Sequence, residues 1–122
     1  MNQTRPLWAW LLFPQLAAII IASVLATTGH FPVAVFQRWP LDKLGHLFAY
    51  GGLAFLGVAF FGPRRRTWFI AGLLVAATLE EISQRAFPAR TFDLGDLAMN
   101  VTGIVGLGAL AARSSSRARR PV

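Results

Sequence analysis

Long apolar runs constrain this chain more than any other feature of its sequence. Each is close to the ~20 residues that an α-helix needs to cross the hydrocarbon of a bilayer. Of the 122 residues, 55% are hydrophobic and only 14% are charged, a composition that a soluble domain of this size cannot bury. The sequence therefore predicts an all-α integral membrane bundle of about four transmembrane helices. The four runs are roughly Leu7 to Thr28, Leu44 to Gly62, Thr67 to Ser83 and Leu94 to Ala112.

Residues beside the runs are those expected at the ends of transmembrane helices. Trp8, Trp39 and Trp68 stand where aromatic rings anchor helices in the membrane interface. Gly62-Pro63 and Pro88 stand where helices should end, because proline cannot donate a backbone hydrogen bond.

The first run has an alternative interpretation as a cleaved signal peptide. Arg5 precedes the run, and Val24-Leu25-Ala26 would serve as a cleavage site. The run is longer than the roughly 7–15 apolar residues of most signal peptides, so we expect a retained helix.

Basic residues predict the side of the membrane that each link faces. Seven of the twelve Lys and Arg residues form two clusters beside apolar runs, a position typical of cytoplasmic flanks and not of nucleic-acid binding. We therefore expect both termini in the cytoplasm and all five acidic residues at the outer face. The clusters are Arg64-Arg65-Arg66 and Arg113, Arg117, Arg119, Arg120. The acids are Asp42, Glu80, Glu81, Asp93 and Asp96.

The predicted domain organisation is one membrane domain over residues 1–112 and a basic tail over residues 113–122. The tail has nothing apolar to bury and is expected to be disordered in the cytoplasm. The chain has no cysteine, which excludes disulfides, a thiol nucleophile and thiolate metal ligands. The oligomeric state stays open, a homo-oligomer included.

Polar residues at the start of the second run are the first candidates for chemistry. Asp42, His46 and Tyr50 recur every fourth residue and so share one helix face, with Lys43 beside them. Asp42 and Lys43 alone would suit an ordinary helix N-terminus in the headgroup zone. His46 lies one turn into an apolar helix and needs a polar partner, which makes it a functional candidate.

Two adjacent carboxylates end the third run. Glu80 and Glu81 oppose the helix macrodipole, so their position costs stability unless a cation offsets it. Gln84 shares a face with either acid. We expect Glu81 to point into the bundle, with Glu80 as the alternative.

The link into the fourth run supplies further candidates. Asp93 is a natural N-cap, since its carboxylate can accept the free amides of the first helical turn. Asp96 and Asn100 lie one turn apart, and Gly103 with Gly106 or Leu107 continues their stripe. Small residues and an amide at that spacing are typical of a helix–helix contact, so Asn100 could act as structural glue alone.

Together these positions resemble the VanZ-like family of small bacterial membrane proteins over roughly residues 42–106. The resemblance implies a multi-pass protein of the bacterial inner membrane, and the family's namesake is associated with resistance to the glycopeptide antibiotic teicoplanin. It implies no established reaction. One departure is Ala89, where the family often has glycine. The positions that carry the resemblance are Asp42-Lys43, His46, Tyr50, Glu81-x-x-Gln84, Pro88-x-Arg90 and Asp96-x-x-x-Asn100-x-x-Gly103.

The first functional hypothesis is that the chain recognises an anionic lipid at the outer leaflet, in a resistance or envelope-maintenance role. Membrane lipids, polyprenyl-phosphate-linked intermediates or a glycopeptide antibiotic would be its partners. Lys43 and Arg90 would bind phosphate or carboxylate, and neighbouring side chains would orient them. The expected ligand-binding residues are Lys43, Tyr50, Gln84, Arg90, Asp93, Asp96 and Asn100.

Two other classes of function remain open. A membrane-embedded enzyme for phosphoryl or acyl chemistry would use His46 as base or nucleophile, oriented by Asp42 and helped by Glu81. Such an enzyme could hold a divalent cation between Glu81, Asp93 and Asp96, because Mg²⁺ prefers carboxylate oxygen. A structural scaffold, with the polar cluster as glue, is the third class.

Overall fold

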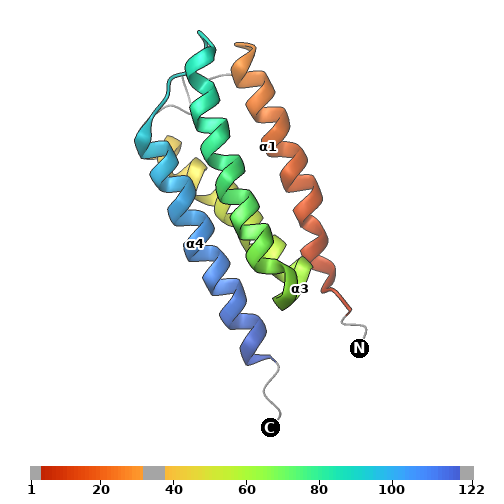
Figure 1. Cartoon of the computed structure of the whole chain (residues 1–122). Helices are drawn as coiled ribbons and strands as arrows, with labels where there is room; N and C mark the ends of the chain where they lie inside the picture. The colour runs from red at the N-terminus through yellow and green to blue at the C-terminus, as the bar shows by residue number, and fades with distance from the viewer. Residues whose placement is uncertain (1–3, 32–37, 119–122) are drawn as a thin grey trace.

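The computed structural model describes residues 4–31 and 38–118 of the chain. All the regular structure in these ranges is helical, which confirms the predicted all-α class. A 3₁₀ helix, η1 (Leu7–Leu11), leads directly into α1 (Leu12–Thr27). Then follow α3 (Leu41–Ser83), the short 3₁₀ helix η2 (Gln84–Ala86) and α4 (Leu94–Arg117), packed lengthwise as an elongated bundle (Figure 1).

Three helical segments of the described chain are long and apolar enough to cross a membrane. They are Leu7–Thr27, Leu41–Ala86 and Leu94–Arg117. The sequence predicted about four; the difference lies in α3, which contains both the second and the third apolar run.

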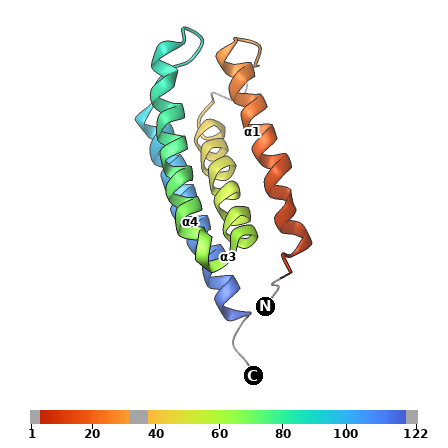
Figure 2. The same cartoon turned by 45° about the vertical axis from the view of Figure 1, so that its right-hand side comes forward.

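α3 is broken at Gly62 and folds back on itself. Gly62 has φ 71° and ψ −175°, a conformation outside the helical region that glycine adopts readily, and Pro63 follows it. The first arm (residues 41–61) and the second arm (residues 63–83) run in opposite directions, side by side (Figure 2). Tyr50 Oη therefore lies 3.0 Å from Glu80 Oε2, although 30 residues of straight helix would span about 45 Å. The predicted helix end at Gly62-Pro63 is the point of reversal.

Small residues bring the first arm of α3 into close contact with α4. A Cβ added to Gly103 would lie 2.2 Å from the carbonyl oxygen of Leu47, and one added to Gly51 would lie 2.6 Å from Leu107 Cδ1. Without side chains at these positions the two backbones approach closely. Of the two continuations predicted for the stripe, Leu107 lies in the contact, whereas Gly106 is exposed with nothing within 4 Å.

α1 is joined to α3 by a smaller contact. Ala9 and Leu12 are buried against Leu53 and Phe60 near the start of α1. Further along, Gln15 Nε2 donates a hydrogen bond to a backbone carbonyl of α3 at 2.9 Å.

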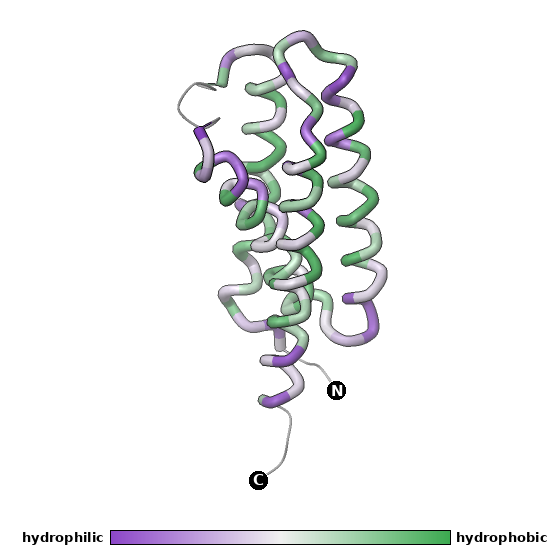
Figure 3. Tube along the Cα trace, turned by 90° about the vertical axis from the view of Figure 1, so that its left-hand side faces the viewer, coloured by the Kyte–Doolittle hydropathy of each residue, from purple (hydrophilic) through white to green (hydrophobic). Residues whose placement is uncertain are grey.

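The outside of the bundle is covered with large apolar side chains. Such a surface is unfavourable in water and suited to lipid. Figure 3 shows hydrophobic residues along the middle of the helices and hydrophilic ones toward the two ends. Side chains more than half exposed include those of Ile20, Ile21, Val75, Leu79 and Val105.

Charge separates the two ends of the bundle. We call one the basic end, where η1 begins and α4 ends (Figure 1). The opposite, acidic end carries all five carboxylates of the chain. The described arginines of the basic end are Arg5, Arg64, Arg65, Arg66, Arg113 and Arg117.

α4 continues past the predicted boundary at Ala112. The segment expected to be disordered is helical from Arg113 to Arg117, while residues 119–122 lie outside the described ranges. The hydroxyls of Ser114, Ser115 and Ser116 each bond to the carbonyl four residues earlier, and cations in the last turn suit the helix macrodipole.

Candidate functional site

Lys43 is the centre of a set of ionic contacts at the acidic end. Its Nζ lies 2.6 Å from Asp93 Oδ2 and 3.3 Å from Asp42 Oδ2, and it also contacts Asp96 Oδ1. The Lys43 side chain is only 21% exposed, so these carboxylates replace much of its hydration. Because α3 begins at Leu41, three residues before the predicted run, the lysine lies in its first turn facing α4. The lysine network comprises Asp42, Lys43, His46, Asp93, Asp96 and Asn100.

Asp93 caps α4, as the sequence predicted. Its Oδ1 accepts a hydrogen bond from the Gly95 amide at 2.7 Å, while Oδ2 contacts Lys43. The hydrogen bond from Lys43 and that from the Gly95 amide hold the pKa of the Asp93 carboxyl below its usual value. Asp93 is therefore ionised wherever the site is used near neutral pH.

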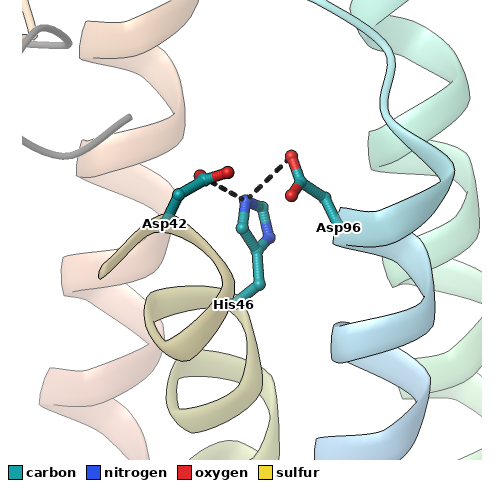
Figure 4. Close-up of side chains that lie close together, drawn as sticks. All are labelled: Asp42, His46 and Asp96. Carbon is teal, nitrogen blue, oxygen red and sulfur yellow. Dashed lines mark ion pairs between the residues drawn. The ribbon is translucent and has the colours of Figure 1, made fainter. Parts of the chain in front are cut away.

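His46 is held between α3 and α4 by both of its ring nitrogens. Nδ1 lies 3.0 Å from Asn100 Oδ1. An amide oxygen only accepts, so Nδ1 carries the donating hydrogen. Nε2 lies 3.4 Å from Asp96 Oδ2 and 3.8 Å from Asp42 Oδ1 (Figure 4). Asn100 is fully buried, so it bonds across the bundle as predicted and also orients the imidazole.

The residues able to hold a metal ion differ from the expected set. In the described ranges, the group with converging ligand atoms is Asp42, His46 and Asp96, whose ligand atoms all lie within 4.8 Å of one another. The expected set of Glu81, Asp93 and Asp96 shares only Asp96 with this group. Asp93 is occupied by Lys43 and the cap of α4, and Glu81 has other partners.

Glu80 organises a second set of contacts. Its Oε1 lies 3.0 Å from Arg90 Nη2 and 3.1 Å from Ser23 Oγ, and its Oε2 accepts the Tyr50 hydroxyl at 3.0 Å. Arg90 Nη1 also reaches the Thr27 hydroxyl of α1 at 3.4 Å. The acid that pairs with Arg90 is thus Glu80, which the sequence offered as the alternative to Glu81 for the acid that points into the bundle. The Glu80 network comprises Ser23, Thr27, Tyr50, Glu80, Gln84 and Arg90.

Glu81 points into the bundle, as predicted, and joins the two networks. Its side chain is fully buried. Gln84 Nε2 donates to Glu81 Oε2 at 3.2 Å, and the backbone amide of Asp93 donates to Oε1 at 3.1 Å. Glu81 thereby ties the end of α3 to the start of α4.

Ser23 and Thr27 are the site residues that sequence reasoning missed. Both belong to α1, whose run was interpreted as a membrane span alone. A hydroxyl in an apolar helix often bonds to a neighbouring helix. The two hydroxyls in this apolar run could therefore have indicated a contact with another helix.

A cavity of about 270 Å³ lies between α1 and α3 at the acidic end. One side of its lining is polar and includes Asp42, His46, Tyr50, Glu80 and Arg90. The apolar part of the lining includes Ile19, Ala22, Ala26, Leu41 and Ala49. The cavity therefore offers charged and apolar surfaces to one molecule.

The two networks and Glu81 together carry more negative than positive charge. They contain all five carboxylates of the chain against the two permanent cations Lys43 and Arg90. Arg85, at the same end, stacks on Phe92 at 4.1 Å and belongs to neither network. With a neutral His46 the site has a formal charge of −3, from five acids and two cations.

Comparisons with family models, with curated proteins and with solved structures found no match for this chain.

Proposed function

We propose that the chain is a VanZ-like multi-pass protein of the bacterial inner membrane in which both arms of α3 cross the bilayer. Each arm has about the 20 residues that a crossing needs, and the reversal at Gly62 separates them. With four spans both termini lie on one side of the membrane, and the positive-inside rule supports the cytoplasm for the basic end and the outer leaflet for the acidic end. The VanZ-like order of polar residues in the sequence supports the same assignment.

The proposed activity is recognition of an anionic amphiphile, either a lipid-linked envelope intermediate or a glycopeptide antibiotic with a lipid tail. The observation that carries the proposal is the cavity between α1 and α3. An apolar lining suits an acyl or prenyl chain, and the ionic rim suits a charged head. Binding alone would let the protein sequester or shield such a molecule.

Arg90 is the proposed contact for the anionic group. A guanidinium has five N–H donors, and three contacts to Glu80, Ser23 and Thr27 are made by its two Nη atoms. The donors that remain would bind phosphate or carboxylate in the fork geometry that arginine favours. Tyr50 donates a hydrogen bond to Glu80 and would hold that carboxylate in place at the rim of the cavity.

Native mass spectrometry of the purified chain in phosphatidylcholine nanodiscs tests the proposal. We expect polyprenyl phosphate to bind at least tenfold more tightly than the uncharged polyprenol. Arg90→Lys should remove most of that preference, because lysine cannot replace the fork. Arg85→Lys is the matched control, since Arg85 lies at the same end and belongs to neither network.

Equal binding of phosphate and alcohol, or equal effects of the two arginine variants, would contradict this function. In cells, the corresponding readout is teicoplanin susceptibility of a sensitive host that expresses each variant. Ala22→Phe, which fills the apolar part of the cavity, should abolish any protection that the wild-type chain gives.

A membrane-embedded enzyme is the second candidate, and the position of His46 favours it. Its Nδ1 is fixed by Asn100 and its ring lines the cavity, as a general base would require. An enzyme would convert the bound lipid to a new species on incubation, and His46→Gln would abolish conversion while sparing binding. An unchanged lipid mass in the wild-type sample excludes this candidate.

A further inference from the structure

His46 Nε2 faces the carboxylates of Asp42 and Asp96. Because Nδ1 donates to Asn100, a neutral His46 turns the lone pair of Nε2 toward Asp96 Oδ2 and Asp42 Oδ1, at 3.4 and 3.8 Å (Figure 4). A lone pair that faces two carboxylate oxygens is repelled by both. A cation bound between the three atoms would offset that repulsion.

The spacing of the three atoms suits a metal ion. Ligand atoms that share a tetrahedral Zn²⁺ at ~2.0–2.1 Å lie about 3.4 Å from one another. The two nitrogen–oxygen separations, 3.4 and 3.8 Å, are close to that value. Small side-chain movements would bring Asp42, His46 and Asp96, whose ligand atoms lie within 4.8 Å of one another, into coordination.

Neighbouring groups hold these ligands in orientation. Lys43 contacts the other oxygen of each carboxylate, Asp42 Oδ2 and Asp96 Oδ1, and so leaves the oxygens nearer to His46 free for a metal. Asn100 fixes the histidine tautomer, as the outer partners of metal-binding histidines commonly do. Asn100 is fully buried, and its Nδ2 has no hydrogen-bond partner among the described residues.

Charge also favours a cation at this position. The formal charge of the two networks with Glu81 is −3 when His46 is counted as neutral, and this excess of negative charge attracts a cation. A divalent ion reduces the charge to −1 and provides a direct ligand for phosphate. Asp42 and His46 both line the cavity, so the open coordination position of the ion would face the proposed lipid site.

We propose that Asp42 Oδ1, His46 Nε2 and Asp96 Oδ2 bind a divalent transition-metal ion of the Zn²⁺ or Mn²⁺ class, which bridges the protein to the phosphate of a bound amphiphile. Imidazole is a good ligand for these ions, whereas Mg²⁺ prefers oxygen and water. Only the bridging role rests on the function proposed above. The metal site itself stands on the geometry of the three side chains.

Metal binding is measured on the full chain in detergent, without lipid. After chelator treatment, Zn²⁺ is titrated by calorimetry and Mn²⁺ by electron paramagnetic resonance. We expect one ion per chain, and at least a tenfold loss of affinity in His46→Gln and in Asp96→Asn. Asn100→Ala should weaken binding by ~10–100-fold through the lost orientation of the ring. His30→Gln, which changes the other histidine of the chain, is the control and should bind normally.

Folding of each variant is checked by circular dichroism, and Asn100→Asp provides a second form that keeps an acceptor for Nδ1 and should retain the ion. A wild-type chain that binds no ion, or variants that bind as tightly as wild type, would overturn the metal site.

Lipid binding with and without Zn²⁺ separates this inference from the proposed function. Metal binding without any preference for polyprenyl phosphate would leave the metal site standing and contradict the function. Phosphate preference that persists in chelator would support the function and overturn the bridging role.

Discussion

Gly103 sets the distance between α3 and α4 because its missing side chain leaves room for the backbone of the other helix. A Cβ there would lie 2.2 Å from the Leu47 carbonyl oxygen, which cannot move without its helix. We expect Gly103→Ala to destabilise the fold by about 1–3 kcal/mol. Gly106→Ala is the control on the same helix, with nothing within 4 Å of the new methyl group. Thermal unfolding in detergent should lower the midpoint for the first variant and leave it unchanged or raised for the second.

Asp93 gives the site a predictable dependence on pH. Lys43 lowers the folded-state pKa of Asp93 below the usual 3.8. The ionised carboxylate therefore stabilises the folded state above pH 3.8, and this stabilisation is lost as pH falls through the folded-state pKa. The Asp93 side chain is 47% exposed, so we expect its charge to contribute less than about 1 kcal/mol to the free energy of unfolding. Asparagine caps helices as well as aspartate does, so Asp93→Asn removes the charge and keeps the helix cap. The melting-temperature difference from wild type should be present at pH 7 and shrink below about pH 4. A difference independent of pH would contradict this assignment.

Residues whose roles depend on adjacent sequence were predictable, and those whose roles depend on the fold were not. Asp93 was recognised as a cap because capping involves the next few amides alone. Glu80 and Glu81 are consecutive and therefore point about 100° apart on the helix. Which one meets Arg90 depends on how the link from α3 to α4 is placed, and this was not available from the sequence.

Among the elements, α3 depends most on one backbone conformation. Gly62 combines φ 71° with ψ −175°, a region that residues with a Cβ enter at a cost of about 1–3 kcal/mol. Nothing lies within 4 Å of a Cβ at Gly62, so Gly62→Ala should destabilise the chain through the backbone alone. Gly72→Ala, also in open space but within regular helix, should be neutral or stabilising. Equal melting temperatures for the two variants would show that the reversal does not need glycine.

Hydropathy predicted where the helices lie, since lipid selects long apolar segments regardless of their partners. It placed the break at Gly62-Pro63 because proline and glycine act locally. It did not predict that α4 reaches Arg117, because helix ends outside the hydrocarbon depend on capping bonds and charge. Nor did it predict the contacts of Ser23 and Thr27, which require α1 to lie against the start of the α3–α4 link.

For the molecule as a whole, the separation of charge predicts its orientation. Eight of the twelve basic residues belong to the side with the termini under the four-span assignment. A reporter fused after Val122 should therefore read cytoplasmic, and one inserted near Phe31 should read external. The opposite pair of readings would contradict the orientation and move the proposed lipid site to the inner leaflet.

The break at Gly62 also places three arginines at the N-terminus of a helical arm. Arg64, Arg65 and Arg66 follow it directly and so occupy the first turn of the second arm of α3. A helix N-terminus carries partial positive charge, which repels them, and no ion pair among the described residues offsets it. If the basic end faces the cytoplasm, as proposed, anionic lipids of that leaflet would supply the missing negative charge, at about 1 kcal/mol per arginine. Part of the folding free energy would then depend on the lipid composition of the membrane, and we expect the chain to be less stable in neutral detergent than in a bilayer that contains anionic lipid.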